Sequence, residues 1–161
     1  MPNQPMTAYR SIFAPGLLRG QVAVVTGGGS GIGRCTAHEL ASLGAAVAIV
    51  GRTAATLDAV RDEIERAGGT CATHVCDIRE EAPVQAMVAA VLARFGRVDA
   101  LVNNAGGQFQ ARLSTISAKG WDAVVRNNLT GGFLVARWAR TDPASRAAHA
   151  PDHTCDRMSI A

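Results

Sequence analysis

The chain has 161 residues, of which 48% are hydrophobic and 18% are charged, and its formal net charge at pH 7 is +3. This composition is that of a folded domain with a core, and it excludes a disordered chain. The scattered arginines exclude a basic stripe for nucleic acid, and no apolar run is long enough to cross a membrane.

The first half of the chain is expected to alternate between strands and helices. Residues 1–20 are rich in proline and are predicted to form an irregular arm without a secretory signal. A β-branched run over residues 21–25 predicts a buried strand, and a glycine-rich turn follows it. A helix is predicted over residues 32–43, which Gly44 ends, and a second buried strand over residues 45–50.

The same alternation continues in the second half. Thr53 is predicted to cap a helix that ends at Gly68. Strands are predicted over residues 70–75 and 98–102, and a longer helix over residues 117–139. Between these two strands lies the clearest amphipathic stripe of the chain, formed by Val84, Met87, Val88, Val91, Leu92 and Phe95.

This order of elements predicts an α/β fold, a doubly wound parallel sheet with helices on both faces. Right-handed crossovers then place the glycine turn at the carboxyl edge of the sheet. We assign residues 21–138 to this domain and expect its sheet to be incomplete on the C-terminal side, because no strand follows the last helix. Residues 139–161 are expected to be an irregular tail, as a shifted reading frame would produce.

The glycine turn has the chemistry of a phosphate site. A helix N-terminus offers free backbone N–H groups and a favourable dipole to an anion, and glycine lets a pyrophosphate approach the backbone. The strict G-x-G-x-x-G spacing is not met, and no Gly-Lys pair of a P-loop follows. The turn fits T-G-x-x-x-G-x-G instead, with the alternative that its glycines are incidental to a flexible loop; the matching residues are Thr26, Gly27, Gly31 and Gly33.

Two side chains near this turn have a predicted role and an alternative. Ser30 either touches a phosphate or is simply a small turn residue. Arg52 follows the second strand, where an acidic residue would bind a free ribose 2′-hydroxyl and a basic one would neutralise a 2′-phosphate. Arg52 therefore favours NADP(H) over NAD(H), and the alternative is a solvated surface arginine.

Three motifs at this spacing resemble those of the classical short-chain dehydrogenase/reductase family: TGGGSGIG at residues 26–33, Asp77 after the third strand, and NNAG at residues 103–106. The resemblance covers about residues 17–136 and implies a Rossmann-like, dinucleotide-binding domain. The segments SIFAPGLLRGQVAVVTGG, NNAGGQF and SAKGWDAVVRNNLTG are similar to those of peroxisomal-type trans-2-enoyl-CoA reductases. This similarity implies an NADP(H)-dependent enzyme of fatty acid metabolism that reduces an enoyl-CoA, or a related acyl thioester or carbonyl, by hydride transfer.

The resemblance also implies roles for individual residues. The turn glycines would lie along the pyrophosphate, Asp77 would bind the adenine amino group, and Asn128 would help to hold a water in a proton relay. Without the family, Asp77 is equally a helix N-cap and Asn128 a solvent-facing helix residue. The implied cofactor contacts are Thr26, Gly27, Ser30, Gly31, Ile32, Gly33, Arg52, Asp77, Ile78, Asn104, Ala105 and Gly106.

One departure from the family concerns its catalytic pair. A tyrosine and a lysine on Tyr-x-x-x-Lys spacing supply the proton, because the lysine charge lowers the pKa of the phenol. Here the only tyrosine is Tyr9 and the only lysine is Lys119, in the wrong regions and the wrong order. We therefore expect a fragment without turnover. The alternatives are a catalytically dead nucleotide-binding or interaction module and a truncated product that does not fold stably.

The remaining residues point to no second chemistry. No pair of the four cysteines has C-x-x-C spacing, which favours reduced thiols and a cytoplasmic protein. His149, His153 and Cys155 lie close in sequence, but proline interrupts this segment, and we expect no metal site. The expected partner is an acyl-CoA-like small molecule, with neither nucleic acid nor membrane, and the helix over residues 117–139 offers a route to a homo-oligomer.

Overall fold

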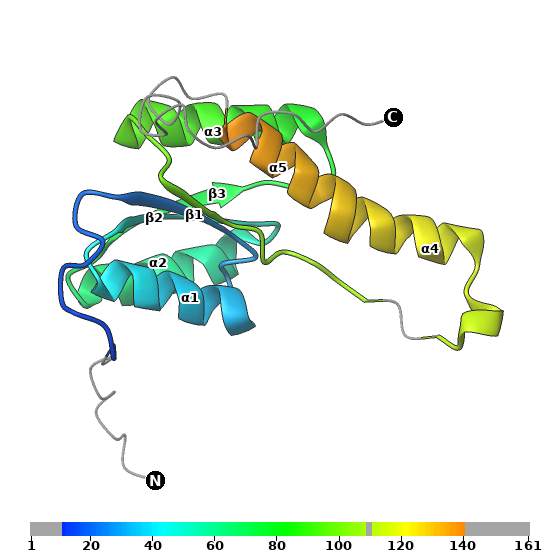
Figure 1. The fold of residues 1–161 in the computed structure, drawn as a ribbon, viewed down its shortest axis with the longest axis horizontal. Helices are drawn as coiled ribbons and strands as arrows, with labels where there is room; N and C mark the ends of the chain where they lie inside the picture. The colour runs from blue at the N-terminus through cyan, green and yellow to red at the C-terminus, as the bar shows by residue number, and fades with distance from the viewer. Residues whose placement is uncertain (1–10, 109–110, 141–161) are drawn as a thin grey trace, which may run out of the picture.

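The computed structural model describes residues 11–108 and 111–140. Within these residues, a parallel four-stranded sheet has the order β3-β2-β1-β4 (Figure 1). The strands are β1 (Val22–Thr26), β2 (Ala46–Gly51), β3 (Thr70–Val75) and β4 (Ala100–Val102). The predicted α/β fold is confirmed, since parallel strands joined by helices form a doubly wound sheet.

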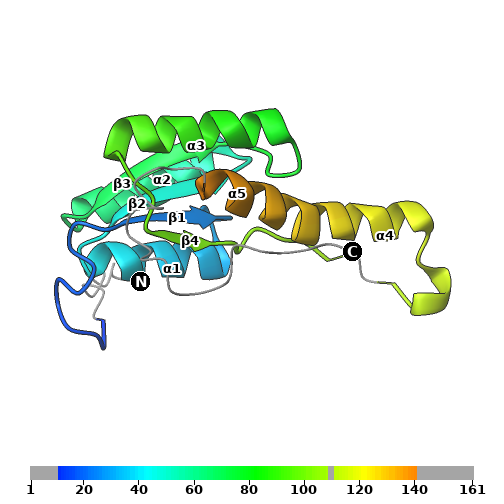
Figure 2. The same cartoon turned by 45° about the horizontal axis from the view of Figure 1, so that its top comes forward.

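The helices cover both faces of the sheet. Helices α1 and α2 lie on one face, and α3 and α5 lie on the other (Figures 1 and 2). Beyond the sheet, α4 continues the line of α5. The helices are α1 (Gly31–Ser42), α2 (Ala54–Arg66), α3 (Glu81–Phe95), α4 (Ala118–Val125) and α5 (Gly131–Ala139), and a short 3-10 helix η1 spans Leu113–Thr115. In this described part of the chain, no helix is long and apolar enough to cross a membrane.

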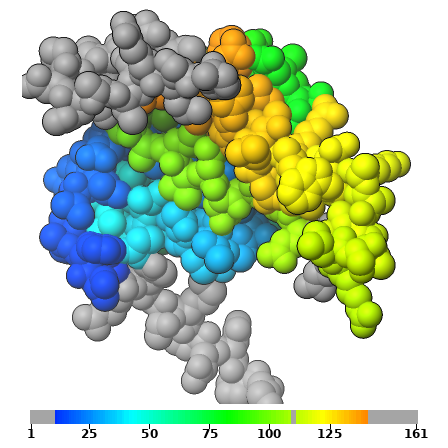
Figure 3. Space-filling view, turned by 45° about the vertical axis from the view of Figure 1, so that its right-hand side comes forward, coloured from blue at the N-terminus to red at the C-terminus, as the bar shows by residue number. Residues whose placement is uncertain are grey.

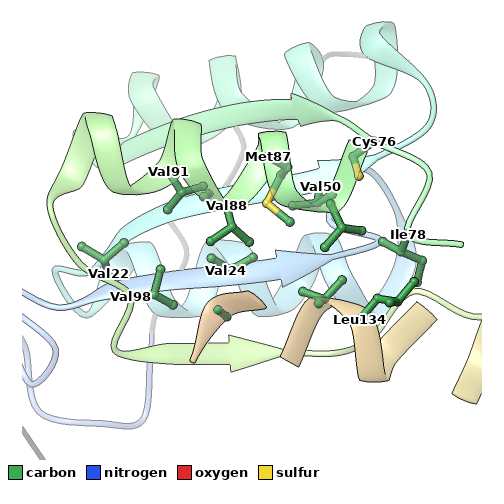
Figure 4. Close-up of a cluster of buried hydrophobic side chains, with 14 residues drawn as sticks. Val22, Val24, Val50, Cys76, Ile78, Met87, Val88, Val91, Val98 and Leu134 are labelled. Carbon is green, nitrogen blue, oxygen red and sulfur yellow. The ribbon is translucent and has the colours of Figure 1, made fainter. Parts of the chain in front are cut away.

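The sheet separates two hydrophobic clusters. On one face, Leu57, Val60 and Ile64 of α2 pack with the small residues of α1 against the sheet. On the other face, the predicted stripe of α3 packs with α5 on β1 and β2, and Figure 4 labels Met87, Val88 and Val91 there. These side chains are almost completely buried, and each such burial stabilises the fold by roughly 1.5–3 kcal/mol.

The predicted element boundaries are mostly within one or two residues of those observed. The fourth strand begins at Ala100 and not at residue 98. Just before it, the carboxylate of Asp99 accepts a hydrogen bond from the backbone N–H of Val22, and the backbone N–H of Asp99 donates to the carbonyl oxygen of Val22. Thr53 occupies the N-cap position of α2, but its side chain makes no capping bond, whereas Ser117 caps α4 by accepting a hydrogen bond from Gly120 N.

The predicted long helix is present, with a change of winding inside it. Between α4 and α5, residues Arg126–Thr130 (η2) form a π-helical segment. π-helical turns are rare in proteins, and those that do occur are frequently found at functional sites. In Figure 3, the segment that leaves β4 (lime) lies between α1 (cyan) and this long helix (yellow to orange). The long helix thus reaches the carboxyl edge of the sheet.

Candidate functional site

An open pocket lies at the carboxyl ends of β1, β2 and β4, with a volume of about 430 Å³. The parallel register brings these strand ends together, so that residues far apart in the sequence meet there. Most of the residues predicted to contact a cofactor line this pocket: Gly27, Ser30, Gly31, Ile32, Arg52, Ile78, Asn104, Ala105 and Gly106. Thr26, Gly33 and Asp77 are not among its lining residues.

The glycine turn is folded tightly against the exit of β4. Gly27 has a φ of +68°, which favours glycine, and a Cβ on it would lie 2.8 Å from the side-chain nitrogen of Asn104. A Cβ on Gly33 would overlap the carbonyl oxygen of Gly27. The Nδ2 group of Asn104 donates to the carbonyl oxygens of Thr26 (3.0 Å) and Gly27 (3.4 Å). These two glycines therefore allow a close contact between backbones and keep the turn in place.

The N-terminus of α1 opens into the pocket. The first backbone N–H groups of a helix have no acceptor within it. Gly31 is the first residue of α1, and apart from its chain neighbours and its own helix backbone, no described residue has an atom within 4 Å of the position that a Cβ would take on it. Ser30 occupies the N-cap position, and its side chain makes no capping bond. This open space beside free amides fits an anionic group.

Thr26 lies beneath the pocket, at the end of β1, and does not line it. Its side chain is completely buried. The hydroxyl donates to the carbonyl oxygen of Val102 (3.3 Å) and accepts from the backbone N–H groups of Asn104 (3.0 Å) and Ala105 (2.9 Å). Thr26 therefore ties the end of β1 to the exit of β4, and its contacts are with the protein backbone.

Arg52 is an exposed lining residue at the start of the loop between β2 and α2. Within residues 11–108 and 111–140, it forms no salt bridge, whereas Arg34, Arg61 and Arg79 each pair with a carboxylate. The guanidinium of Arg52 is therefore available to a negatively charged group in the pocket.

Asp77 is held by its neighbour Arg79. The carboxylate accepts hydrogen bonds from Arg79 Nε (2.9 Å), Nη2 (2.5 Å) and the backbone N–H (3.1 Å). These bonds, with the charges of Arg79 and Arg52 adding to them against a smaller opposing effect of burial, lower the pKa of Asp77 to about 2. Asp77 does not cap α3, because Glu80 occupies the N-cap position. Its neighbours Cys76 and Ile78 line the pocket.

Asn128 lies in η2 and fastens the loop after β4 to the long helix. Its Oδ1 accepts from Gly107 N (3.1 Å), and its Nδ2 donates to Gly107 O (2.7 Å) and Val124 O (2.9 Å). The residue is exposed, but its amide is engaged by the backbone. The preceding Asn127, which the sequence did not single out, is the asparagine that lines the pocket.

The pocket also contains residues that were not predicted to contact the cofactor. Thr53 and Thr56 belong to the N-terminus of α2, which faces the glycine turn, and a Cβ on Gly29 would lie 2.8 Å from the Thr56 hydroxyl. Thr53 and Thr56 could have been predicted from their positions just after Arg52, because a second helix starts there at the same edge of the sheet. The full set of missed lining residues is Gly29, Val50, Gly51, Thr53, Thr56, Leu57, Cys76 and Asn127.

The thiols and histidines form no second site in the structure as described. Cys71 and Cys76 are buried and free, and desolvation raises the pKa of Cys71 to about 12 and that of Cys76 to about 11. Among the residues described, no group of three or more His, Cys, Asp or Glu side chains could hold a metal ion. The histidines and the cysteine of residues 149–155 lie outside the described residues.

Comparison with known proteins gives one consistent family. The family described as "short chain dehydrogenase" matches residues 21–143. A probable 2,4-dienoyl-CoA reductase of Bacillus subtilis is 34% identical over 119 residues, which are 74% of this chain and 47% of that protein. The chain spans about half the length of the curated relatives that it matches.

Two solved structures share the fold over most of the chain. A citronellol catabolism dehydrogenase of Pseudomonas aeruginosa PAO1 has 56% sequence identity and a TM-score of 0.79, covering 83% of this chain and 54% of that one. A metagenomic short-chain oxidoreductase, solved in complex with NADP, has 45% identity and a TM-score of 0.75. In that case 81% of this chain and 59% of the other are covered.

Proposed function

Because the chain belongs to the short-chain dehydrogenase family, we propose that it binds NADP(H) in the pocket at the carboxyl edge of its sheet. The observation that carries this proposal is an open helix N-terminus on the same pocket as Arg52, which forms no salt bridge with the residues that the structure describes. The first suits a pyrophosphate and the second suits a 2′-phosphate. The metagenomic relative that was solved with NADP supports the choice of cofactor.

The pyrophosphate would lie at the turn between β1 and α1. The free N–H groups at the start of α1 would donate to its oxygens, and the space beside Gly31 leaves room for the approach. The helix dipole adds a favourable potential for negative charge at that point.

The adenosine would lie toward the ends of β2 and β3. Arg52 would neutralise the 2′-phosphate with charge-assisted hydrogen bonds. Ile78 would pack on the base, and Asp77 would accept a hydrogen bond from its amino group. In the structure described here, Arg79 occupies both oxygens of Asp77, so the base would share this carboxylate with Arg79.

When bound, the cofactor supplies the hydride of a reduction. Asn128 would act by holding the loop after β4 in place through Gly107, beside which a relay water would be bound. A tyrosine on Tyr-x-x-x-Lys spacing is absent from the 161 residues. We therefore expect this chain to bind the cofactor without turnover, as the nucleotide-binding part of an oxidoreductase or as a catalytically dead module.

The substrate of the corresponding oxidoreductase would be an enoyl-CoA or a related acyl thioester or carbonyl. The similarity to the dienoyl-CoA reductase of B. subtilis supports this choice. A second candidate is an alcohol of terpenoid type, which the 56% identity with a dehydrogenase of citronellol catabolism favours.

The test is equilibrium binding of NADPH and NADH to the wild-type chain and to Arg52→Ala. Loss of a charge-assisted phosphate contact should weaken NADPH binding by roughly tenfold or more, because such bonds contribute about 1.5–3 kcal/mol. NADH has no 2′-phosphate, so its affinity should change much less. Arg66→Ala, at another exposed arginine, is the matched control. A wild-type chain that binds neither nucleotide would refute the proposal.

A further inference from the structure

Gly131, at the start of α5, packs directly on a residue of the pocket wall. It is buried, and a Cβ on it would lie 2.8 Å from both Cδ1 and Cγ1 of Ile78 and 3.4 Å from the Ile78 carbonyl oxygen. Real Cβ atoms do not approach carbon this closely, so Ile78 would have to move if residue 131 carried a side chain.

Ile78 lies between the core and the pocket. The residue is 6% exposed and belongs to the hydrophobic cluster formed by α3, α5 and the sheet. Figure 4 shows it at the end of this cluster, beside Leu134 of α5. It also lines the pocket. The close-packed core has no room for a displaced side chain. An Ile78 side chain pushed by a new Cβ would therefore move into the pocket, where there is space.

We propose that Gly131 is a positioning residue for the pocket. Its missing side chain lets α5 approach the segment after β3 and keeps Ile78 withdrawn from the space of the cofactor's base. This inference rests on the proposed function, because it assigns the Ile78 wall to the adenine end of NADP(H). Gly131 lies in α5, outside the glycine turn of residues 26–33, so the inference extends the residues that shape the pocket to the long helix.

The next residue of α5 provides a matched control. Among the described residues, a Cβ on Gly132 would meet the side chain of Asn103, at 3.6 Å, which is an ordinary contact. Both substitutions replace glycine by a better helix former in the same helix. Gly131→Ala and Gly132→Ala therefore share the change in helix propensity and differ in the contact with Ile78.

The experiment measures the dissociation constants of NADPH, of 2′,5′-ADP and of nicotinamide mononucleotide for the full chain. Gly131→Ala should weaken NADPH and 2′,5′-ADP by roughly tenfold, as expected for an overpacking energy of about 1–3 kcal/mol directed into a site. Nicotinamide mononucleotide should be unaffected, since it has no adenine, and Gly132→Ala should bind all three ligands like the wild type.

A pair of variants tests whether Ile78 transmits the effect. In the Ile78→Ala background the clashing atoms are gone, so adding Gly131→Ala should change the affinity for 2′,5′-ADP by less than about twofold. This comparison remains valid if Gly131→Ala alone does not fold. An equal loss of affinity in both backgrounds, or wild-type affinity in Gly131→Ala, would overturn the inference. A wild-type chain that binds neither adenine ligand would instead refute the proposed function and the inference with it.

Discussion

The hydroxyl of Thr26 joins the ends of two strands that are separated by more than 70 residues. Its side chain is completely buried, and the hydroxyl serves as one donor and as an acceptor for two backbone N–H groups. A motif match places a threonine beside the cofactor, whereas the hydrogen bonds assign it to the support of the pocket. Such a residue acts on binding through the loop that it holds.

Replacing Thr26 by valine keeps the shape and removes the hydroxyl. Because the N–H group of Ala105 would then lose its acceptor and that of Asn104 would keep only the carbonyl oxygen of Val102, we expect the free energy of unfolding to fall by roughly 1–2 kcal/mol. Urea denaturation followed by circular dichroism measures this change. Thr26→Ser retains the hydroxyl and should lose clearly less, and equal losses for the two variants would contradict this role.

Asp77 makes a pH-dependent contribution to stability. Hydrogen bonds from Arg79 lower its pKa from 3.8 to about 2 in the folded chain. A carboxylate with a depressed folded pKa stabilises the fold above its unfolded pKa, and this contribution is lost as the pH falls through the folded pKa. Asp77→Asn should thus be less stable than the wild type at pH 7, and the difference should shrink between about pH 4 and pH 2.

Urea midpoints over this pH range measure the difference between the two proteins. Asp122→Asn serves as the control, because this carboxylate is exposed in α4 and forms no salt bridge with any residue that the structure describes. The pairing of Asp77 with Arg79 would be disproved by a gap between Asp77→Asn and the wild type that stays constant down to pH 2.

Helices α1 and α2 share one hydrophobic cluster, and a carboxylate of α2 also bonds to two side chains of α1. Glu63 of α2 accepts from Arg34 Nε (2.8 Å) and His38 Nε2 (2.9 Å) of α1. The bonds from Arg34 and His38 lower the pKa of Glu63, against a smaller opposing effect of burial. These contacts hold the helix that begins at the glycine turn against its neighbour.

Glu63→Gln removes the charge and keeps the size of the side chain. We expect a loss of roughly 0.5–1 kcal/mol in unfolding free energy at low salt, since the pair is partly exposed, and a smaller loss at high salt. Glu65→Gln, at an exposed position of the same helix, should change the unfolding free energy less. Thermal unfolding at two ionic strengths distinguishes the two variants, and a salt-independent loss would argue against an ion pair.

The elements themselves could be predicted from the sequence because their signals are local. Apolar spacing predicted α3, which ends at Gly96 with a φ of +77°. The π-helical segment could not be predicted, since no residue of Arg126–Thr130 demands a wider turn by its own propensity. It arises where Asn128 bonds to Gly107 and Gly131 packs on Ile78, which are contacts of the tertiary structure.

In the whole molecule, the sequence motifs were sufficient to locate the site. The contacts that each side chain makes there could be seen only in the structure. The order of the predicted strands and helices was enough to place the glycine turn and Arg52 at one edge of the sheet. Whether a residue faces the pocket depends on side-chain direction, which the spacing of motifs does not determine. For this reason Asn127 lines the pocket while Asn128 bonds to a loop, and Asp77 turns to Arg79.

The turn between β1 and α1 is proposed to bind the pyrophosphate of NADP(H). Backbone amide shifts in ¹H–¹⁵N spectra, recorded while the labelled chain is titrated with NADPH, test this binding residue by residue. We predict that residues 27–33 and 104–106 shift together and saturate with one dissociation constant. Saturable shifts confined to other residues, or an unchanged spectrum at high NADPH, would contradict the account.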